Sequence, residues 1–253
     1  TSMGKKLFLV LLALILVLSM TACSSTNEQP GTTEPGESTE TTESEESTES
    51  TGSTESGGVE TVVPGKFTVG FDQNFPPMGF VGDDGEFTGF DLELAAEVAD
   101  RLGLELALQP IAWDAKDMEL STKNIDCIWN GFTINGREDK YTWTEPYMSN
   151  NQVFVVRADS GITSLADLAG KTVIVQVDSS AEAALAERPD LVDTFGEYLT
   201  AADYNSALMD LEAGAVDAVA MDDTVANYQI EKRGSKFVVL EEKLAAEDYG
   251  VGF

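Results

Sequence analysis

Two residues of opposite charge, distant in the sequence, occupy positions where strands are expected to end. Arg137 follows a short apolar run that breaks at Asn130 and Gly131, and Asp222 closes the apolar run VDAVAMD. A guanidinium group binds a carboxylate through two parallel hydrogen bonds, whereas a carboxylate accepts hydrogen bonds from an ammonium group. Arg137 and Asp222 together could therefore bind both charged ends of a zwitterion.

Each of the two residues also has an ordinary structural interpretation. Arg137 could lie on the surface and pair with Glu138 or Asp139, an exposed contact that would contribute little to stability. Asp222 could be only the neighbour of Asp223, which is placed to cap the helix that follows. Both interpretations stay open at the level of the sequence.

Other polar residues are predicted near the same strand ends. In NGFTI a hydroxyl and exposed backbone groups follow the first run, and in VDSSAEAALAE two serines precede a helix. A helix N-terminus presents free amide groups and the positive end of its dipole, so it can bind a carboxylate. The same serines could also be N-caps. These candidate residues are Asn130, Gly131, Thr133, Ser179 and Ser180.

Two aromatic residues and one further acid follow the first two predicted strands. Phe75 stands in the proline-containing loop of FDQNFPPMGF, and Trp113 follows ELALQPIA. Both could enclose a ligand side chain, or both could be ordinary core aromatics. Asp72, at the end of KFTVGFD, could face the ligand side chain or cap the turn.

The elements that must position these residues are short apolar runs that alternate with helical patterns from Lys66 onward. Such alternation predicts α/β layers with mostly parallel strands, and the length favours two lobes over one. The segments MELSTKNIDCIWNG and LMDLEAGAVDAVAMD resemble each other, each with a helix, a short turn and a strand. In open α/β sheets ligands bind beyond the carboxyl ends of the strands.

The composition excludes several classes of partner and site. The chain of 253 residues has a formal net charge of -30, so nucleic acid and anionic membrane surfaces are not expected partners. It contains no histidine, which excludes histidine-dependent triads and histidine metal sites. Cys127 lies in an apolar run and Cys23 lies near the N-terminus, so no disulfide framework, metal site or cofactor is expected.

The first 60 residues are not expected to belong to a folded domain. Residues 1–23 have the plan of an export signal, with two lysines, an apolar run and then small residues. This run is shorter than the roughly 20 apolar residues that span a membrane. Cys23 ends a segment that resembles a bacterial lipobox, so its lipidation is expected. Residues 24–60 are predicted to be a disordered acidic tether, with an acidic interaction tail as the alternative.

The stretch GFDLELAAEVADRL, residues 89–102, resembles the signature of family 3 of the bacterial extracellular solute-binding proteins, the polar amino-acid receptors of ABC transporters. The resemblance runs from about residue 66 to residue 253 and includes the FPP loop, NGFTI with the following arginine, TEPYM, SLADLAGKTVIVQ and VDAVAMD. It implies a two-lobed, periplasmic-binding-protein-like α/β fold of the class II type, hinged by two crossover strands. Lobe 1 would comprise residues 61–155 with 248–253 returning to it, and lobe 2 residues 156–247.

The resemblance also implies roles for the candidates. Arg137 would bind the α-carboxylate of an amino acid with help from Ser180. Asp222 would bind the α-ammonium group together with Thr133 and the carbonyl of Gly131.

The side chain of the ligand would lie between Phe75 and Trp113, with Asp72 near its far end. An acidic lobe and Asp72 favour a cationic or amide side chain, such as that of lysine, arginine, histidine or glutamine, while cystine stays open.

Two departures from the family pattern affect these expectations. The interval from Thr133 to Arg137 is one residue shorter than usual, so this loop must be tightened. Family members also continue with helices beyond the segment that YGVGF resembles, so the first lobe is expected to lack its C-terminal part.

The function implied is that of an extracytoplasmic receptor, anchored to the bacterial cell membrane through Cys23. It would close on a polar amino acid and deliver it to an ABC permease, and we expect a monomer. One alternative is an enzyme on the same fold, since dehydratases resembling cyclohexadienyl dehydratase share it, although no carboxylate pair stands out as general acid and base. A sensor module is the other alternative.

Overall fold

The structure is a computed structural model that describes residues 59–234 and 236–253. The predicted signal peptide with Cys23, and residues 24–58 of the predicted tether, lie outside the described residues. Within the described part of the chain, no helix combines the length and the apolar character needed to cross a membrane.

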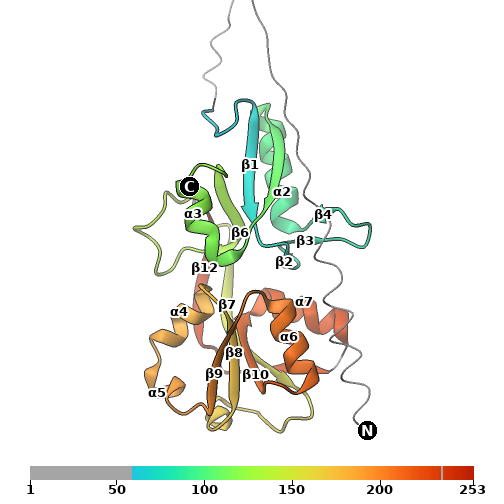
Figure 1. The fold of residues 1–253 in the computed structure, drawn as a ribbon, viewed down its shortest axis with the longest axis vertical. Helices are drawn as coiled ribbons and strands as arrows, with labels where there is room; N and C mark the ends of the chain where they lie inside the picture. The colour runs from blue at the N-terminus through green and yellow to red at the C-terminus, as the bar shows by residue number, and fades with distance from the viewer. Residues whose placement is uncertain (1–58, 235) are drawn as a thin grey trace, which may run out of the picture. The chain divides into compact units, whose positions relative to one another are not determined.

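Most described strands join one mixed sheet in the order β5-β1-β6-β12-β7-β10-β8-β9, with β11 beside β7, and β2, β3 and β4 form a small second sheet (Figure 1). The strands are Lys66–Phe71 (β1), Asn74–Phe75 (β2), Gly79–Val81 (β3), Phe87–Thr88 (β4), Glu105–Pro110 (β5), Cys127–Thr133 (β6), Met148–Arg157 (β7), Thr172–Gln176 (β8), Glu197–Ala201 (β9), Ala218–Asp222 (β10), Phe237–Val239 (β11) and Ala245–Gly252 (β12). The helices are Phe90–Leu102 (α2), Lys116–Ser121 (α3), Ser180–Ala186 (α4), Pro189–Val192 (α5), Tyr204–Ala213 (α6) and Asp223–Arg233 (α7), with 3-10 turns at Trp113–Ala115 (η1) and Leu165–Leu168 (η2).

The sheet has two parallel halves joined by antiparallel strands. β1 pairs in parallel with β5 and β6, and β8 pairs in parallel with β9 and β10. β7 and β12 run antiparallel to each other between the halves, and Figure 1 shows α2 and α3 with the first half and α4 to α7 with the second. The predicted α/β fold of two lobes joined by two crossover strands is confirmed.

The register of the crossover strands brings distant residues together. β10 pairs with β7 so that Asp222 lies opposite Gln152. β12 pairs with β7 and then with β6, where Tyr249 lies opposite Thr133. Side chains alternate between the two faces of a strand, so Glu247 lies on the same face of β12 as Tyr249. The crossover strands therefore gather polar groups from three segments at one place.

The two similar segments of the sequence form similar units. α3 leads into β6, and α6 leads into β10. α6 begins where the Asp203 carboxylate accepts a hydrogen bond from the Ser206 amide (2.9 Å), and it ends at Gly214 in the left-handed conformation. β6 ends at Thr133 and β10 ends at Asp222, and both residues line the same cleft.

Helix α2 fixes the strand that carries Gly131 and Thr133. It starts at Gly89, whose φ of 134° suits glycine, and a Cβ there would lie 2.3 Å from the Met78 carbonyl oxygen. Asp91 in its first turn is buried and accepts a hydrogen bond from the Gly131 amide (2.5 Å). The helix is thereby tied to the end of β6, from which the site is built.

Candidate functional site

A cleft with about 230 Å³ of empty space lies where the two halves of the molecule meet. Eight of the ten residues predicted from the sequence line it. The lining residues are Phe75, Trp113, Gly131, Thr133, Arg137, Gln176, Ser179, Ser180 and Asp222.

Arg137 is a buried cation in this cleft, and its side chain is 9% exposed. Its guanidinium donates to the carbonyl of Thr133 (3.2 Å) and to the carbonyl of Asp178 (3.4 Å), and it lies 5.2 Å from the ring centre of Phe132. Among the described residues no carboxylate lies within ion-pair distance of it. The interpretation of Arg137 as a surface residue paired with its acidic neighbours is therefore wrong.

The short loop before Arg137 closes as a tight turn. The Arg137 amide donates to the carbonyl of Ile134 (2.8 Å), and Gly136 has a φ of 76°, which glycine adopts without strain. The turn folds the guanidinium back over the end of β6. The missing residue is thus accommodated with the side chain still in the cleft.

Asp222 is a buried carboxylate at the end of β10. It accepts hydrogen bonds from Tyr249 (2.7 Å) and from the Asn150 amide (2.8 Å). Burial and, next, the nearby Glu247 carboxylate raise the pKa of Asp222 well above its usual range. Asp222, and not Asp223, occupies the N-cap position of α7, but its side chain makes no capping bond.

Ser179 and Ser180 have different roles, since Ser179 caps a helix and Ser180 faces the cleft. The Ser179 hydroxyl caps α4 by accepting from the Glu182 amide (3.1 Å). The Ser180 hydroxyl accepts from Gln152 (2.9 Å) and lies 3.2 Å from the hydroxyl of Thr133 on the other half of the molecule. Ser180 thus connects the lobes beside Arg137.

The aromatic walls are buried and come from the first lobe. Phe75 lies 6.0 Å from the ring of Tyr204, centre to centre, and Trp113 packs edge-on against Phe132 at 5.4 Å. Gly131 has a φ of 55°, and a Cβ there would lie 2.9 Å from the Phe75 ring. Both aromatics therefore contribute to the core and to the lining of the cleft.

Two predicted residues lie beside the cleft and do not line it. Asp72 accepts from the Asn74 amide (2.8 Å), which closes a turn, and from Gln176 of the second lobe (2.8 Å), and burial raises its pKa. It therefore caps the turn and also faces the other lobe. Asn130 points its side-chain oxygen at Gly79, where a Cβ would approach to 2.9 Å, so this side chain is turned into the first lobe.

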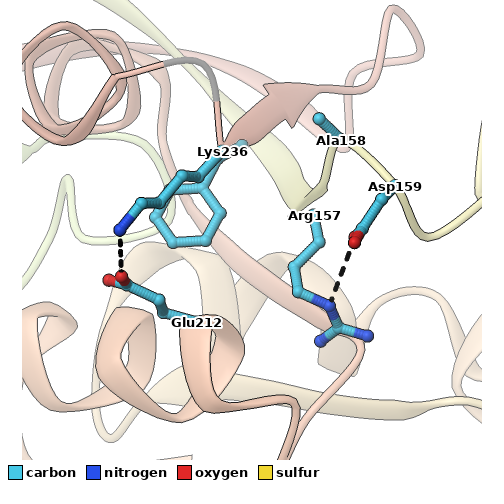
Figure 2. A pocket seen from close by; sticks show the side chains of 6 residues that line it. Arg157, Ala158, Asp159, Glu212 and Lys236 are labelled. Atoms are coloured by element: carbon cyan, nitrogen blue, oxygen red, sulfur yellow. Dashed lines mark hydrogen bonds and ion pairs between the residues drawn. The ribbon is translucent and has the colours of Figure 1, made fainter.

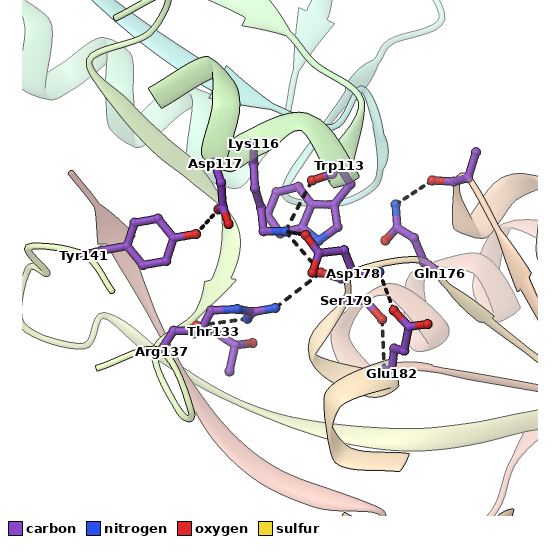
Figure 3. A network of polar contacts seen from close by, with 11 residues as sticks. Trp113, Lys116, Asp117, Thr133, Arg137, Tyr141, Gln176, Asp178, Ser179 and Glu182 are labelled. Carbon is purple, nitrogen blue, oxygen red and sulfur yellow. Dashed lines mark hydrogen bonds and ion pairs between the residues drawn. The ribbon is translucent and has the colours of Figure 1, made fainter. Parts of the chain in front are cut away.

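The lobes touch through a buried lysine (Figure 3). Lys116 of α3 forms an ion pair with Asp178 of the second lobe and donates to its carbonyl (3.2 Å). Burial lowers the pKa of Lys116, although the pairing with Asp178 partly opposes this. The same Asp178 carbonyl accepts from Arg137, so two cations hold one loop of the second lobe against the first.

A neighbouring hollow with about 740 Å³ of empty space continues from the cleft past Trp113. Its charged side chains are three carboxylates, Asp72, Asp114 and Asp203, and none of its lining residues is a lysine or arginine. Its electrostatic potential must therefore be negative, which favours a cation there.

A different hollow, with about 760 Å³ of empty space, lies on the second lobe and shares no residue with the cleft. Figure 2 shows that its charges are already matched, with Lys236 paired to Glu212 and Arg157 near Asp159 at 3.8 Å. Arg157 also donates to two backbone carbonyls. This hollow offers no unpaired charge to a ligand.

Comparison with known proteins agrees with this geometry. The family model described as "Bacterial extracellular solute-binding proteins, family 3" matches residues 67–229. The chain belongs to this family. The resemblance seen in the sequence is thus confirmed, and the segments that carry it build both walls of the cleft.

Individual relatives of this solute-binding protein are binding proteins for amino acids. The L-cystine-binding protein TcyJ of Escherichia coli is 34% identical over 190 residues, which cover 74% of this chain and 70% of the relative. A Streptococcus pneumoniae ABC uptake transporter substrate-binding protein with bound histidine is similar in structure, with a TM-score of 0.71, 37% identity, and coverage of 74% and 78% of the two chains. Holo ArgBP of T. maritima has a TM-score of 0.68 and 34% identity, covering 74% and 81%.

Sequence reasoning missed one carboxylate of this solute-binding protein. Glu247 is buried on β12, where its Oε1 accepts from Thr133 (2.8 Å), Asn150 (2.7 Å) and Gln152 (2.8 Å). The expectation that no carboxylate pair stands out is therefore wrong, because Glu247 and Asp222 share the Asn150 amide. The alternation of Glu247 and Tyr249 could have indicated a strand face, but the pattern is short.

Proposed function

We propose that the protein captures a free amino acid in the cleft and delivers it to an ABC permease. One observation carries this proposal: a buried guanidinium and a buried carboxylate line the same cleft, and neither has an ion-pair partner among the described residues. A buried charge without its counter-charge is costly, so Arg137 and Asp222 favour a ligand that supplies both. An α-amino acid has both a carboxylate and an ammonium group.

In this proposal each lining group has a role. Arg137 binds the α-carboxylate with Ser180, and Asp222 binds the α-ammonium group with Thr133 and the Gly131 carbonyl. Ser179 holds the start of α4 in place. Phe75 and Trp113 flank the side chain of the ligand.

We further propose that the ligand has a cationic or amide side chain. Asp72 lines the acidic hollow beside the cleft, and the second α-carboxylate of cystine would meet other carboxylates there. Relatives are named as binding cystine or arginine, and solved structures hold histidine, arginine or glutamine. The acidic hollow favours the cationic ligands among these.

The proposal places the protein outside the cytoplasm, attached to the cell membrane by a lipid on Cys23. Its support is the family, whose members are extracellular, and the sequence pattern before Cys23. The domain boundaries, with lobe 1 at residues 61–155 and 248–253 and lobe 2 at 156–247, belong to the same proposal. The acidic segment 24–60 would space the lobes from the membrane.

Isothermal titration with the twenty amino acids and cystine tests the binding function. The expected result is saturable binding of one or a few polar amino acids. The N-acetyl and amide derivatives of the best ligand provide matched controls, because each removes one of its two charges. Binding of both derivatives as tight as that of the parent would contradict the zwitterion site.

A catalytic function is the second candidate, and the Asp222–Glu247 pair favours it because paired carboxylates with different environments can serve as acid and base. The relatives named above are binding proteins. Proton NMR of a ligand incubated with the protein separates the two functions, since a receptor returns it unchanged.

A further inference from the structure

Glu247 and Asp222 form a pair of buried acids with no cation beside them among the described residues. Asn150 donates to Glu247 (2.7 Å) and to Asp222 (2.8 Å) from one amide nitrogen, so the two carboxylate oxygens are close neighbours. Two ionised carboxylates at such a distance from each other, away from water, repel strongly. The empty site is therefore expected to hold one proton.

The hydrogen bonds indicate which carboxylate keeps its charge. Glu247 Oε1 accepts short hydrogen bonds from Thr133, Asn150 and Gln152, and a longer contact of 3.4 Å comes from Ser180. Asp222 has two donors, Asn150 and Tyr249. Hydrogen bonds to the charged form stabilise it, so the shared proton is assigned to Asp222, the carboxylate with fewer donors.

In the part of the chain that the structure describes, the surroundings supply no other group that would neutralise the pair. Tyr204 of α6 and Tyr249 of β12 both face the pair, and burial raises the pKa of both phenols, which stay neutral. Arg137 after β6 donates to the Thr133 carbonyl, and Asp72 accepts from the Asn74 amide and from Gln176. The remaining neighbours on β7 and α4 are neutral amides and a hydroxyl.

We propose that Glu247 is a positioning residue that couples ligand capture to proton release. The empty protein holds one proton on the Asp222–Glu247 pair. When the ammonium group of the ligand binds Asp222, its positive charge replaces that proton, which leaves to solvent, and both carboxylates are then ionised. This deepens the proposed function and rests on it, because the cation that enters is the α-ammonium of an amino acid.

The buried side-chain oxygen of Gln152 supports a proton or another hydrogen-bond donor beside this pair. Its amide nitrogen donates to Glu247 and to Ser180, but its Oε1 has no hydrogen-bond donor among the described residues. A buried acceptor without a partner is costly. A carboxyl proton or a ligand N–H group in this network would satisfy it.

The sign of the coupling fixes the pH dependence. Below the raised pKa of Asp222 and above its ordinary value, binding releases a proton, so affinity rises with pH by up to about tenfold per unit. Above the raised pKa the pair holds no proton and the dependence ends. Neither the α-carboxylate nor the α-ammonium group of the ligand titrates in the range used below.

The test is calorimetric titration of the full chain with L-arginine, and with L-glutamine as a second probe, from about pH 5 to about pH 8. Each titration is run in two buffers that both have buffering capacity at that pH, phosphate and Tris near neutral pH and acetate and MES at lower pH, because their different ionisation enthalpies report the protons released. The wild type is expected to release up to one proton per ligand, with affinity rising along the pH series. Glu247→Gln should shift this dependence to lower pH and release less than half as much near neutral pH.

The half-buried neighbour Asp248, whose carboxylate accepts from Ser149 (2.8 Å), provides the matched control, since Asp248→Asn removes the same charge from the next position. This variant should release as many protons as the wild type. If the wild type binds either probe but releases no proton at any pH, the coupling is wrong while the amino-acid function stands. Equal proton release by Glu247→Gln would overturn the role of Glu247, and absence of binding to both probes would overturn the proposal together with its proposed ligand class.

Discussion

Asp91 connects the stability of the first lobe to pH, and the effect can be calculated. The carboxylate is fully buried in the first turn of α2, and its Oδ2 accepts from the Gly131 amide (2.5 Å) and from the Tyr147 hydroxyl (2.9 Å). Burial raises its pKa to about 7, although these hydrogen bonds oppose the shift. The folded protein therefore binds this proton more tightly than the unfolded chain does.

The sign and size of the stability change follow from this shift. Because the folded pKa exceeds the unfolded one, the stabilisation is complete below the unfolded value near 4 and is lost as pH rises through about 7. A shift of about three units corresponds to roughly 4 kcal/mol in the free energy of unfolding. Asp91→Asn should be free of this dependence, since an amide oxygen can accept both hydrogen bonds.

Urea unfolding of wild type and Asp91→Asn from about pH 4 to about pH 8 measures the effect. The stability advantage of the wild type over the variant should decrease by roughly 4 kcal/mol across this range. Glu93→Gln, an exposed position in the same helical turn, is the control and should follow the wild type. A difference between wild type and Asp91→Asn that stays constant with pH would refute the reasoning.

Three further predictions concern the anchor, the ligand side chain and the contact between lobes. Cys23→Ala should abolish fatty-acid labelling in a bacterium, and equal labelling would exclude the anchor. Asp72→Asn should weaken the binding of a cationic ligand about ten- to a hundredfold more than that of a neutral one. An equal loss of affinity for both ligands would mean that Asp72 only caps the turn. Lys116→Met should speed ligand dissociation about fivefold in stopped-flow measurements, since the half-exposed Asp178 makes this pair worth about 1 kcal/mol; an unchanged rate would mean that closure does not depend on it.

The main elements of the fold were predictable because apolar runs and helical patterns alternate without ambiguity. The same logic located Arg137 and Asp222, since parallel strands deliver their carboxyl ends to one region. The small sheet of β2, β3 and β4 was not predicted, because strands of two or three residues leave no periodic pattern.

The side that a residue faces was harder to predict than its position. All seven residues of β6 are buried, so alternation could not tell that Asn130 turns into the lobe while Thr133 lines the cleft. Glu247 was missed because a polar residue at a strand start is typical of a loop, and its burial depends on pairing with distant strands. The contact of Lys116 with Asp178 depends on how the lobes meet, which no local pattern encodes.

Titration of Arg137→Ala with the best amino-acid ligand tests the zwitterion site most directly. Removing the guanidinium leaves the ligand carboxylate buried without its counter-charge, so affinity should fall by several kcal/mol, or at least a hundredfold. Arg137→Lys should restore only part of the lost affinity, since an ammonium group cannot reproduce the two parallel hydrogen bonds of a guanidinium group. Arg188→Ala, which removes an exposed arginine paired with Asp190, is the control and should bind as the wild type does. Normal binding by Arg137→Ala would contradict the assignment of Arg137 as the carboxylate-binding residue.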